Sequence, residues 1–246
     1  MSPVELEIWL NHFEHHAQHP RCVPDDLSDH LRPDERRLIA NSIATFQLGE
    51  QSEGRTLLRA AQRVAHERRI PALVRIVELF IREEQGHAAL LRTFMEEHHI
   101  ALKRSDWTDW VFRLVRRLAG LELYIYILIS AELIGIVYYR ALEAATDCRR
   151  LRALCRGLVS DELAHVGFES QLLLALRAGR SAPVQALMRL AHRAFITGTA
   201  GLVWLTHRSV LRQGGYGARS FLHACLSQYA FYLAPVNVTL APTSLP

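Results

Sequence analysis

Residues 81–91 read IREEQGHAALL, and this stretch decides the fold because it places a carboxylate and an imidazole inside an apolar pattern. Glu84 and His87 are three residues apart, so they share one face of a helix. Apolar residues occupy the rest of that face at steps of three or four: Leu73, Val77, Phe80, Leu91 and Phe94. We therefore predict a helix over residues 71–99 whose buried side carries both groups.

The same pattern recurs later in the chain. Glu162 and His165 are again three residues apart within an apolar stripe. The apolar members of that stripe are Leu151, Leu154, Leu158, Leu172 and Leu176. This spacing predicts a second helix, over residues 147–178, that also buries a carboxylate and an imidazole.

Two more predicted helices each carry one carboxylate within an apolar stripe, Glu50 in the first and Glu132 in the third. Ligands of one metal centre must lie at one depth of a bundle. In an antiparallel helix pair, residues at the same depth are equidistant from the turn. The midpoint of Glu50 and Glu84 is residue 67, beside one predicted turn, and the midpoint of Glu132 and Glu162 is residue 147, at another. Four glutamates and two histidines are therefore expected at one level of the core.

The periodicity predicts an all-α protein, because no alternating strand pattern occurs. A crossover with its own short helix, near residues 107–118, lets the second and third long helices run parallel. The expected organisation is an N-terminal extension with a short helix (residues 1–33), a four-helix bundle (residues 34–180) with helices over 34–69, 71–99, 120–146 and 147–178, and C-terminal helices near 183–213 and 218–233 with a tail, packed on the bundle (residues 181–246).

A third pair with this spacing, Glu96 and His99, is expected to be a chance match. It lies about 18 Å along the helix from Glu84, at about 1.5 Å per residue, which is too far for one site. It also lies beside Glu97 and His98 at a polar helix end.

The buried carboxylates need a cationic partner, because unpaired charges in a core are costly and the four stripes contain no lysine or arginine. Two divalent cations would balance four carboxylates, and each imidazole adds a neutral ligand. The candidate ligands are Glu50, Glu84, His87, Glu132, Glu162 and His165. The alternative is a set of polar core residues satisfied by hydrogen bonds alone.

This ligand pattern resembles that of the ferritin-like di-iron carboxylate proteins, over residues 34–178. A second acid, Glu83 or Asp161, precedes each ExxH pair. The resulting EExxH and DExxH motifs look like those of the soluble acyl-carrier-protein desaturases and related oxygenases. The resemblance implies a ferritin-like bundle with a crossover helix and a cofactor of two iron ions, or a manganese–iron or manganese pair.

The resemblance also implies a role for each residue. Glu84 and Glu162 would bridge the two metals. Glu50 and His87 would complete the coordination of one metal ion. Glu132 and His165 would complete the coordination of the other. Glu83 and Asp161 would orient the histidines from behind, unless they face solvent.

For function, the resemblance implies an oxidoreductase that activates O₂ to hydroxylate, desaturate or N-oxygenate an organic substrate. Electrons would come from a separate donor such as a ferredoxin or reductase. The long chain after residue 178 favours this activity over iron storage. A peroxidase or ferroxidase similar to rubrerythrin or bacterioferritin is the alternative, and a non-enzymatic metal-binding bundle is a further one.

The charge of the chain leaves several partners open. Its formal net charge is +4, with a pI near 9.1, and Lys103 is the only lysine among the basic residues. A basic surface suits a carrier-bound substrate, an acidic electron donor or RNA, as in di-iron tRNA hydroxylases. Because the arginines are spread along the chain and not clustered in one run, an ordinary solvated surface is the favoured interpretation. The sequence also allows a homodimer.

The remaining composition indicates a cytoplasmic protein with no membrane partner. Glu5 and Glu7 lie where a secretory signal needs an apolar run. The apolar stretch 121–139 contains Glu122 and Glu132, so we expect a buried helix and not a membrane span. The four cysteines form no CxxC pair, which excludes a rubredoxin-like iron site and indicates reduced thiols.

Three smaller patterns have two interpretations each. The histidines of the short N-terminal helix either bind a metal at the surface or form a solvated face: His12, His15, His16 and His19. The glycines near the ligands either leave space at the metals or allow tight packing: Gly54, Gly86, Gly135 and Gly167. Three tyrosines either relay electrons or fill the core: Tyr126, Tyr138 and Tyr139.

Overall fold

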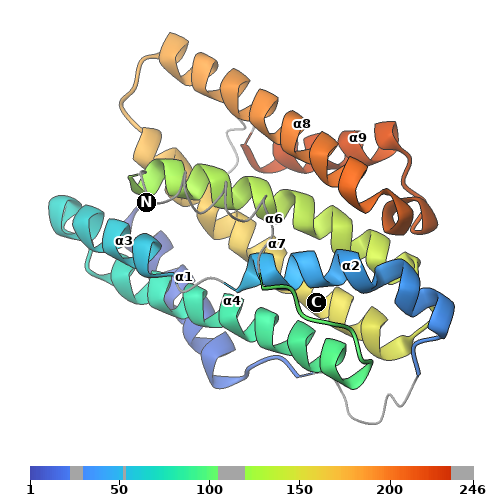
Figure 1. The fold of residues 1–246 in the computed structure, drawn as a ribbon. Coiled ribbons are helices and arrows are strands. Elements are labelled where there is room, and N and C mark those ends of the chain that lie inside the picture. The colour runs from blue at the N-terminus through green and yellow to red at the C-terminus, as the bar shows by residue number, and fades with distance from the viewer. Residues whose placement is uncertain (23–29, 52–53, 105–119, 234–246) are drawn as a thin grey trace.

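The computed structural model describes residues 1–22, 30–51, 54–104 and 120–233. Within these ranges every regular element is a helix, which confirms the all-α prediction (Figure 1). The helices are α1 (Pro3–Gln18), α2 (Pro33–Glu50), α3 (Arg55–Arg68), α4 (Ala72–Glu97), α6 (Leu121–Ala144), α7 (Arg149–Arg177), α8 (Ala182–Gln213) and α9 (Ala218–Leu233). The crossover helix expected near residues 107–118 and the tail after residue 233 lie outside the described residues.

Helix α6 forms the centre of the molecule. Its sequence is largely apolar, and α7, α8, α9 and α3 pack around it. By length and composition alone it is the one helix among the described residues that could cross a membrane. Most of that helix is nevertheless buried inside the protein, as expected for the apolar stretch 121–139.

Four helical rods surround the core that contains the candidate ligands, namely α2 together with α3, α4, α6 and α7. Helices α2 and α3 follow one another alongside α4, and both pack against it (Figure 1). Helix α4 also contacts α7, which packs along α6. The turn between Ala144 and Arg149 contains the midpoint expected for Glu132 and Glu162, and the turn between Arg68 and Ala72 begins just after the midpoint expected for Glu50 and Glu84. Assignment of this arrangement to the ferritin-like bundle stays a prediction.

The prediction of one continuous helix over residues 34–69 is wrong, because the chain breaks between α2 and α3. Gly54 has a φ of 64°, in the left-handed region that favours glycine. A Cβ at this position would lie 2.5 Å from Cγ2 of Ile81, so the close approach to α4 also requires glycine. Helix α2 consequently ends at Glu50, which leaves that carboxylate at a helix terminus.

Two outer layers cover the rods. Helix α1 lies against α4 on one side, and α8 and α9 pack on α6 on another (Figure 1). Helix α1 begins with a capping box, in which Glu5 N donates to Ser2 Oγ and Ser2 N donates to Glu5 Oε2. Trp9 Nε1 donates to Gln171 Oε1 on α7 at 2.9 Å. The N-terminal helix is therefore packed into the molecule.

Candidate metal centre

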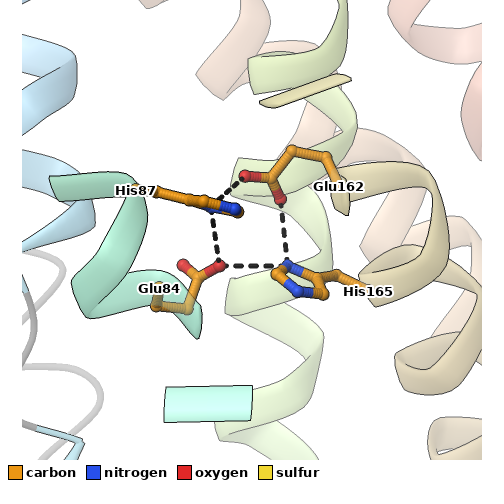
Figure 2. A group of neighbouring side chains, drawn as sticks. All are labelled: Glu84, His87, Glu162 and His165. Carbon is orange, nitrogen blue, oxygen red and sulfur yellow. Dashed lines mark ion pairs between the residues drawn. The ribbon is translucent and has the colours of Figure 1, made fainter. Parts of the chain in front are cut away.

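Glu84 and His87 on α4 face Glu162 and His165 on α7 in one buried cluster (Figure 2). One ligand atom from each residue lies within 4.8 Å of the others. Nδ1 of His87 lies 3.5 Å from Glu84 Oε1 and 3.3 Å from Glu162 Oε1. Nδ1 of His165 lies 3.0 Å from Glu84 Oε1 and 3.4 Å from Glu162 Oε2. Each carboxylate therefore lies between both imidazoles.

The outer nitrogen of each imidazole faces an acid from the opposite helix. Nε2 of His87 on α4 donates to Oδ2 of Asp161 on α7 at 3.1 Å. Nε2 of His165 on α7 lies 3.3 Å from Oε2 of Glu83 on α4. Each acid therefore lies behind an imidazole, Asp161 fully buried and Glu83 partly buried. The contacts cross between the helices, a feature that the motifs did not reveal.

Residues of the N-terminal segment hold these two acids. Arg21 Nε donates to Asp161 Oδ2 at 2.7 Å, and Arg21 Nη2 donates to the other carboxylate oxygen. Nδ1 of His16 lies 2.7 Å from Oε1 of Glu83. Arg21 was not predicted as a site residue, because it follows α1 and belongs to no periodic pattern.

The N-terminal histidines do not form one solvated face. His15 and His19 are exposed, whereas His12 and His16 are partly buried. Burial, together with the charge of His16, lowers the pKa of His12 to about 4. The buried face of α1 contains Leu6, Trp9 and Phe13. His16 is the next position at the same helical step, so the periodicity contained a signal for its inward direction.

Glu50 and Glu132 reach the same region from α2 and α6. Tyr139 Oη donates to Glu50 Oε1 at 2.6 Å, whereas neither oxygen of Glu132 has a hydrogen-bond partner among the described residues. The charge of His87 acts on the pKa of Glu50, and that of His165 acts on the pKa of Glu132. One cavity is lined by all four predicted carboxylates, Glu50, Glu84, Glu132 and Glu162.

A further carboxylate, Glu169, was missed. It is fully buried one helical turn after His165, and its charge raises the pKa of Glu132. Neither of its oxygens has a hydrogen-bond partner among the described residues. The signal was available in the sequence, because the stripe on α7 passes from His165 to Leu172 through Glu169 by steps of four and three.

Burial and mutual repulsion govern the electrostatics of the cluster. Burial raises the pKa of Glu50, Glu132 and Glu169 well above the ordinary carboxyl value, and neighbouring carboxylates raise it further. Burial alone would lower the pKa of His87 and His165, but contacts with the surrounding acids outweigh burial and raise it well above the ordinary value. The site therefore favours cations strongly.

The residues present fit divalent metal ions. Several buried polar atoms of the cluster have no hydrogen-bond partner among the described residues: Glu84 Oε1, His87 Nδ1, His165 Nδ1 and both carboxylate oxygens of Glu132 and Glu162. Buried polar atoms are normally hydrogen-bonded, so this converging set offers coordination positions that a metal ion could fill. Carboxylate oxygens and imidazole nitrogens are the donors that iron and manganese accept. Metal ions would also offset the repulsion among the carboxylates.

A cavity of about 410 Å³ adjoins the carboxylates. We name it the α8 cavity, because Thr199, Leu202 and Thr206 of α8 contribute to its wall. The other walls come from α2, α4, α6, α7 and Lys103, and include Phe46, Ile127, Leu128, Ile134 and Tyr139. A second cavity, of about 380 Å³, lies behind the histidines and is lined by His87, Asp161, Glu83, His15, His16 and His19.

The glycines divide between the two interpretations. A Cβ on Gly54 or Gly167 would press on Ile81 or Trp9, so these two allow tight packing. Gly135 lines the α8 cavity, and a Cβ there would have only an atom of Tyr139 within 4 Å, at 3.9 Å. Gly135 therefore leaves space beside the carboxylates.

The other predicted features lie at different distances from the cluster. Glu96 and His99 are exposed at the end of α4 and outside the cluster, as predicted. Tyr138 is fully buried and stacks on Phe46, and Tyr126 stacks on His192. Among these tyrosines, Tyr139 is the one for which the structure records a hydrogen bond to a candidate ligand.

Comparison of the chain with protein-family models, with curated proteins and with solved structures finds no match. The case for a function therefore depends on the geometry of the cluster and of the α8 cavity.

Proposed function

We propose that this protein is a non-haem oxidoreductase that uses two iron ions to activate O₂ and oxidise a small, mainly apolar organic molecule. The observation that carries the proposal is the position of the α8 cavity, whose wall includes four of the candidate ligands, Glu50, Glu84, Glu132 and Glu162. An iron-storage or structural site has no need of such a space. Its volume of about 410 Å³ lies within the ordinary range for small-molecule sites.

The bridging role proposed for Glu84 and Glu162 is supported by their central positions. Each lies within 3.5 Å of both His87 and His165. The charge of His87 acts to lower the pKa of Glu50, and the charge of His165 acts to lower the pKa of Glu132. This proximity supports the ligand pairs that the motif resemblance implies.

Asp161 and Glu83 prepare the imidazoles for metal binding. Because Asp161 accepts a hydrogen bond from Nε2 of His87, the neutral imidazole keeps its lone pair on Nδ1, which faces the carboxylates. Glu83 favours the same tautomer of His165 from 3.3 Å. Arg21 and His16 hold these acids in place from α1 and the segment after it.

Two bound ferrous ions would supply the electrons that reduce O₂. In a hydroxylation, one oxygen atom enters the C–H bond and the other leaves as water, with consumption of two protons and two electrons. A separate iron–sulfur or flavin protein must resupply these electrons. The mainly apolar walls of the α8 cavity would hold the substrate beside the carboxylates and limit the access of water to the metal ions.

Ferroxidase or peroxidase activity is the second candidate, and the cavity behind the histidines favours it. His15, His16, His19 and Glu83 line that cavity together with His87. These side chains offer a Fe²⁺ ion coordinating groups between the surface and the cluster.

A single set of experiments separates the two candidates. The protein is loaded anaerobically with Fe²⁺ and mixed with ¹⁸O₂, an electron donor, and apolar probes such as indole and decanoic acid. We expect a transient visible absorption whose decay a bound probe accelerates, and ¹⁸O in the product. Fast peroxide or Fe²⁺ turnover that no organic probe changes, without ¹⁸O incorporation, would favour the second candidate instead.

A further inference from the structure

The outward face of α8 is apolar along most of its length. Leu187, Leu190 and Leu205 are each exposed by more than 60%, and Val184 by 46%. The opposite face of the helix is buried against the rest of the molecule through His192, Ile196, Ala200, His207, Val210 and Leu211. Large apolar side chains that gather on one exposed helix face mark an interaction surface.

The centre of this face consists of small residues. We define the outer stripe as the exposed positions at alternating steps of four and three: Leu187, Ala191, Ala194, Gly198, Gly201 and Leu205. A Cβ built on Gly198 or Gly201 has no atom of the described residues within 4 Å, apart from the neighbouring backbone of its own helix, so no packing contact among these residues requires glycine there. Glycine inside a helix costs roughly 1 kcal/mol relative to alanine, so the two glycines are unexplained by the monomer.

The outer stripe is symmetric about Ile196, and this symmetry matches an antiparallel pairing with a second copy. In that pairing Leu187 lies opposite Leu205 of the second copy, at both ends of the contact. Ala191 lies opposite Gly201, and Ala194 lies opposite Gly198. Large residues therefore meet at the ends while small residues meet in the middle, where the two helices approach most closely. A two-fold interface requires such self-complementarity.

The arginines of α8 favour the antiparallel direction. A parallel pairing in register would place Arg193 and Arg208 next to their own copies, and α8 contains no acidic residue to offset the repulsion. In the antiparallel pairing Arg193 lies level with Thr199 of the second copy, so the two Arg193 residues are separated by about 9 Å along the helix axis, from six residues at about 1.5 Å each. Charges of one sign are thereby kept apart.

We propose that the protein is a homodimer whose two copies pack their α8 helices antiparallel along the outer stripe, about Ile196. This surface is independent of the metal chemistry, but it has a consequence for the α8 cavity. Thr199, Leu202 and Thr206 line the cavity from positions adjacent to Gly198, Gly201 and Leu205. Pairing therefore supports the cavity wall from its outer side.

Size measurement of the purified protein tests the proposal. Analytical ultracentrifugation should give about twice the chain mass of 28.0 kDa. Gly198→Leu and Gly201→Leu place a large side chain where the second copy approaches, so each should weaken dimerisation by about thirtyfold or more. Both should leave the circular dichroism unchanged, because the monomer has space at these positions. Ala89→Leu, at an exposed position of α4, is the matched control and should remain dimeric.

Cross-linking tests the direction of pairing. Cys22 is the exposed cysteine and is first replaced by serine. Leu187→Cys and Leu205→Cys proteins are then prepared separately and treated with a short bismaleimide. In the antiparallel dimer, equivalent positions lie about 27 Å apart, from 18 residues at about 1.5 Å each, so neither protein should cross-link alone. Their mixture should give a covalent dimer.

Three results would overturn the proposal. A monomer at all protein concentrations would contradict it, including one that binds anionic phospholipid vesicles through the same leucines. A dimer that survives both glycine substitutions would place the interface elsewhere. Cross-linking of either single-cysteine protein with itself would contradict the antiparallel direction.

Discussion

Nε2 of His87 on α4 donates to Oδ2 of Asp161 on α7 at 3.1 Å, so the acid beside one ExxH pair holds the histidine of the other. Glu83 lies in the equivalent position behind His165, at 3.3 Å. The two helices are therefore joined by reciprocal contacts as well as by the central carboxylates. A shift of one helix along the other would disrupt all of these contacts together.

Substitution of the acids behind the histidines should weaken metal binding without abolishing it. In Asp161→Asn and Glu83→Gln the ligands remain but their orientation is less firmly held, so metal affinity should fall by about 10–100-fold with the stoichiometry unchanged. Competition with a coloured chelator measures the change. Glu78→Gln, an exposed position on α4, serves as the control. An unchanged affinity in both variants would show that the contacts are only structural.

Loss of either bridging carboxylate should remove most of the metal. The wild-type protein loaded anaerobically should contain close to two iron ions per chain, whereas Glu84→Ala and Glu162→Ala should retain little iron by elemental analysis. Glu96→Ala with His99→Ala repeats the motif substitution at an exposed site and should retain both ions. Two ions bound in the Glu84→Ala, Glu162→Ala double variant would contradict the site.

Replacement of Glu169 should stabilise the metal-free protein. Burial raises the pKa of this carboxyl in the folded state above its value in the unfolded chain. Its contribution to the stability of the folded state is therefore fully present below the ordinary carboxyl pKa and is lost as the pH rises. Glu169→Gln should therefore increase the free energy of unfolding by about 1–3 kcal/mol at pH 8 and by less at pH 4. Urea unfolding at both pH values provides the measurement. The same increase in the free energy of unfolding at both pH values, or a decrease at pH 8, would contradict this prediction.

The buried imidazole of His192 should make the protein sensitive to acid. Burial lowers the pKa of His192 to about 3, below the ordinary histidine value near 6.5, so the unfolded chain binds the additional proton between these values. Stability should fall with decreasing pH over this window, by about 1.4 kcal/mol per pH unit for one proton. His192→Gln should reduce that slope, because glutamine does not titrate. An identical slope in both proteins would indicate that this histidine is already protonated when folded.

Filling the space at Gly135 should separate substrate oxidation from metal binding. Gly135→Val adds side-chain atoms inside the α8 cavity, where a Cβ has ordinary contact with Tyr139. We expect two bound iron ions and a reaction with O₂ that apolar probes no longer accelerate, as measured by stopped-flow absorption. Ala89→Leu should behave like the wild type. If apolar probes still accelerate the reaction with O₂ fully in Gly135→Val, the substrate must bind at another surface.

Periodicity in the sequence was sufficient to predict which helices carry the candidate ligands and the depth at which they lie. The same periodicity passed through Glu169 and His16, which were overlooked because neither belongs to a repeated motif. Arg21 could not be predicted, since it reaches Asp161 only after α1 has packed on the bundle. The break at Gly54 was missed for a related reason, because the contact with Ile81 that requires it is formed between separate helices. Metal binding by the cluster stays a prediction.

The break between α2 and α3 has a consequence for how this protein can change during evolution. In a continuous helix, one inserted residue would rotate every later side chain by about 100°. Here Glu50 is the last residue of α2, and α3 starts again at Arg55. Insertions and deletions in the connection would leave the orientation of Glu50 unaltered. Length variation among homologues should therefore be tolerated between Gln51 and Gly54, and rare within α4 and α7.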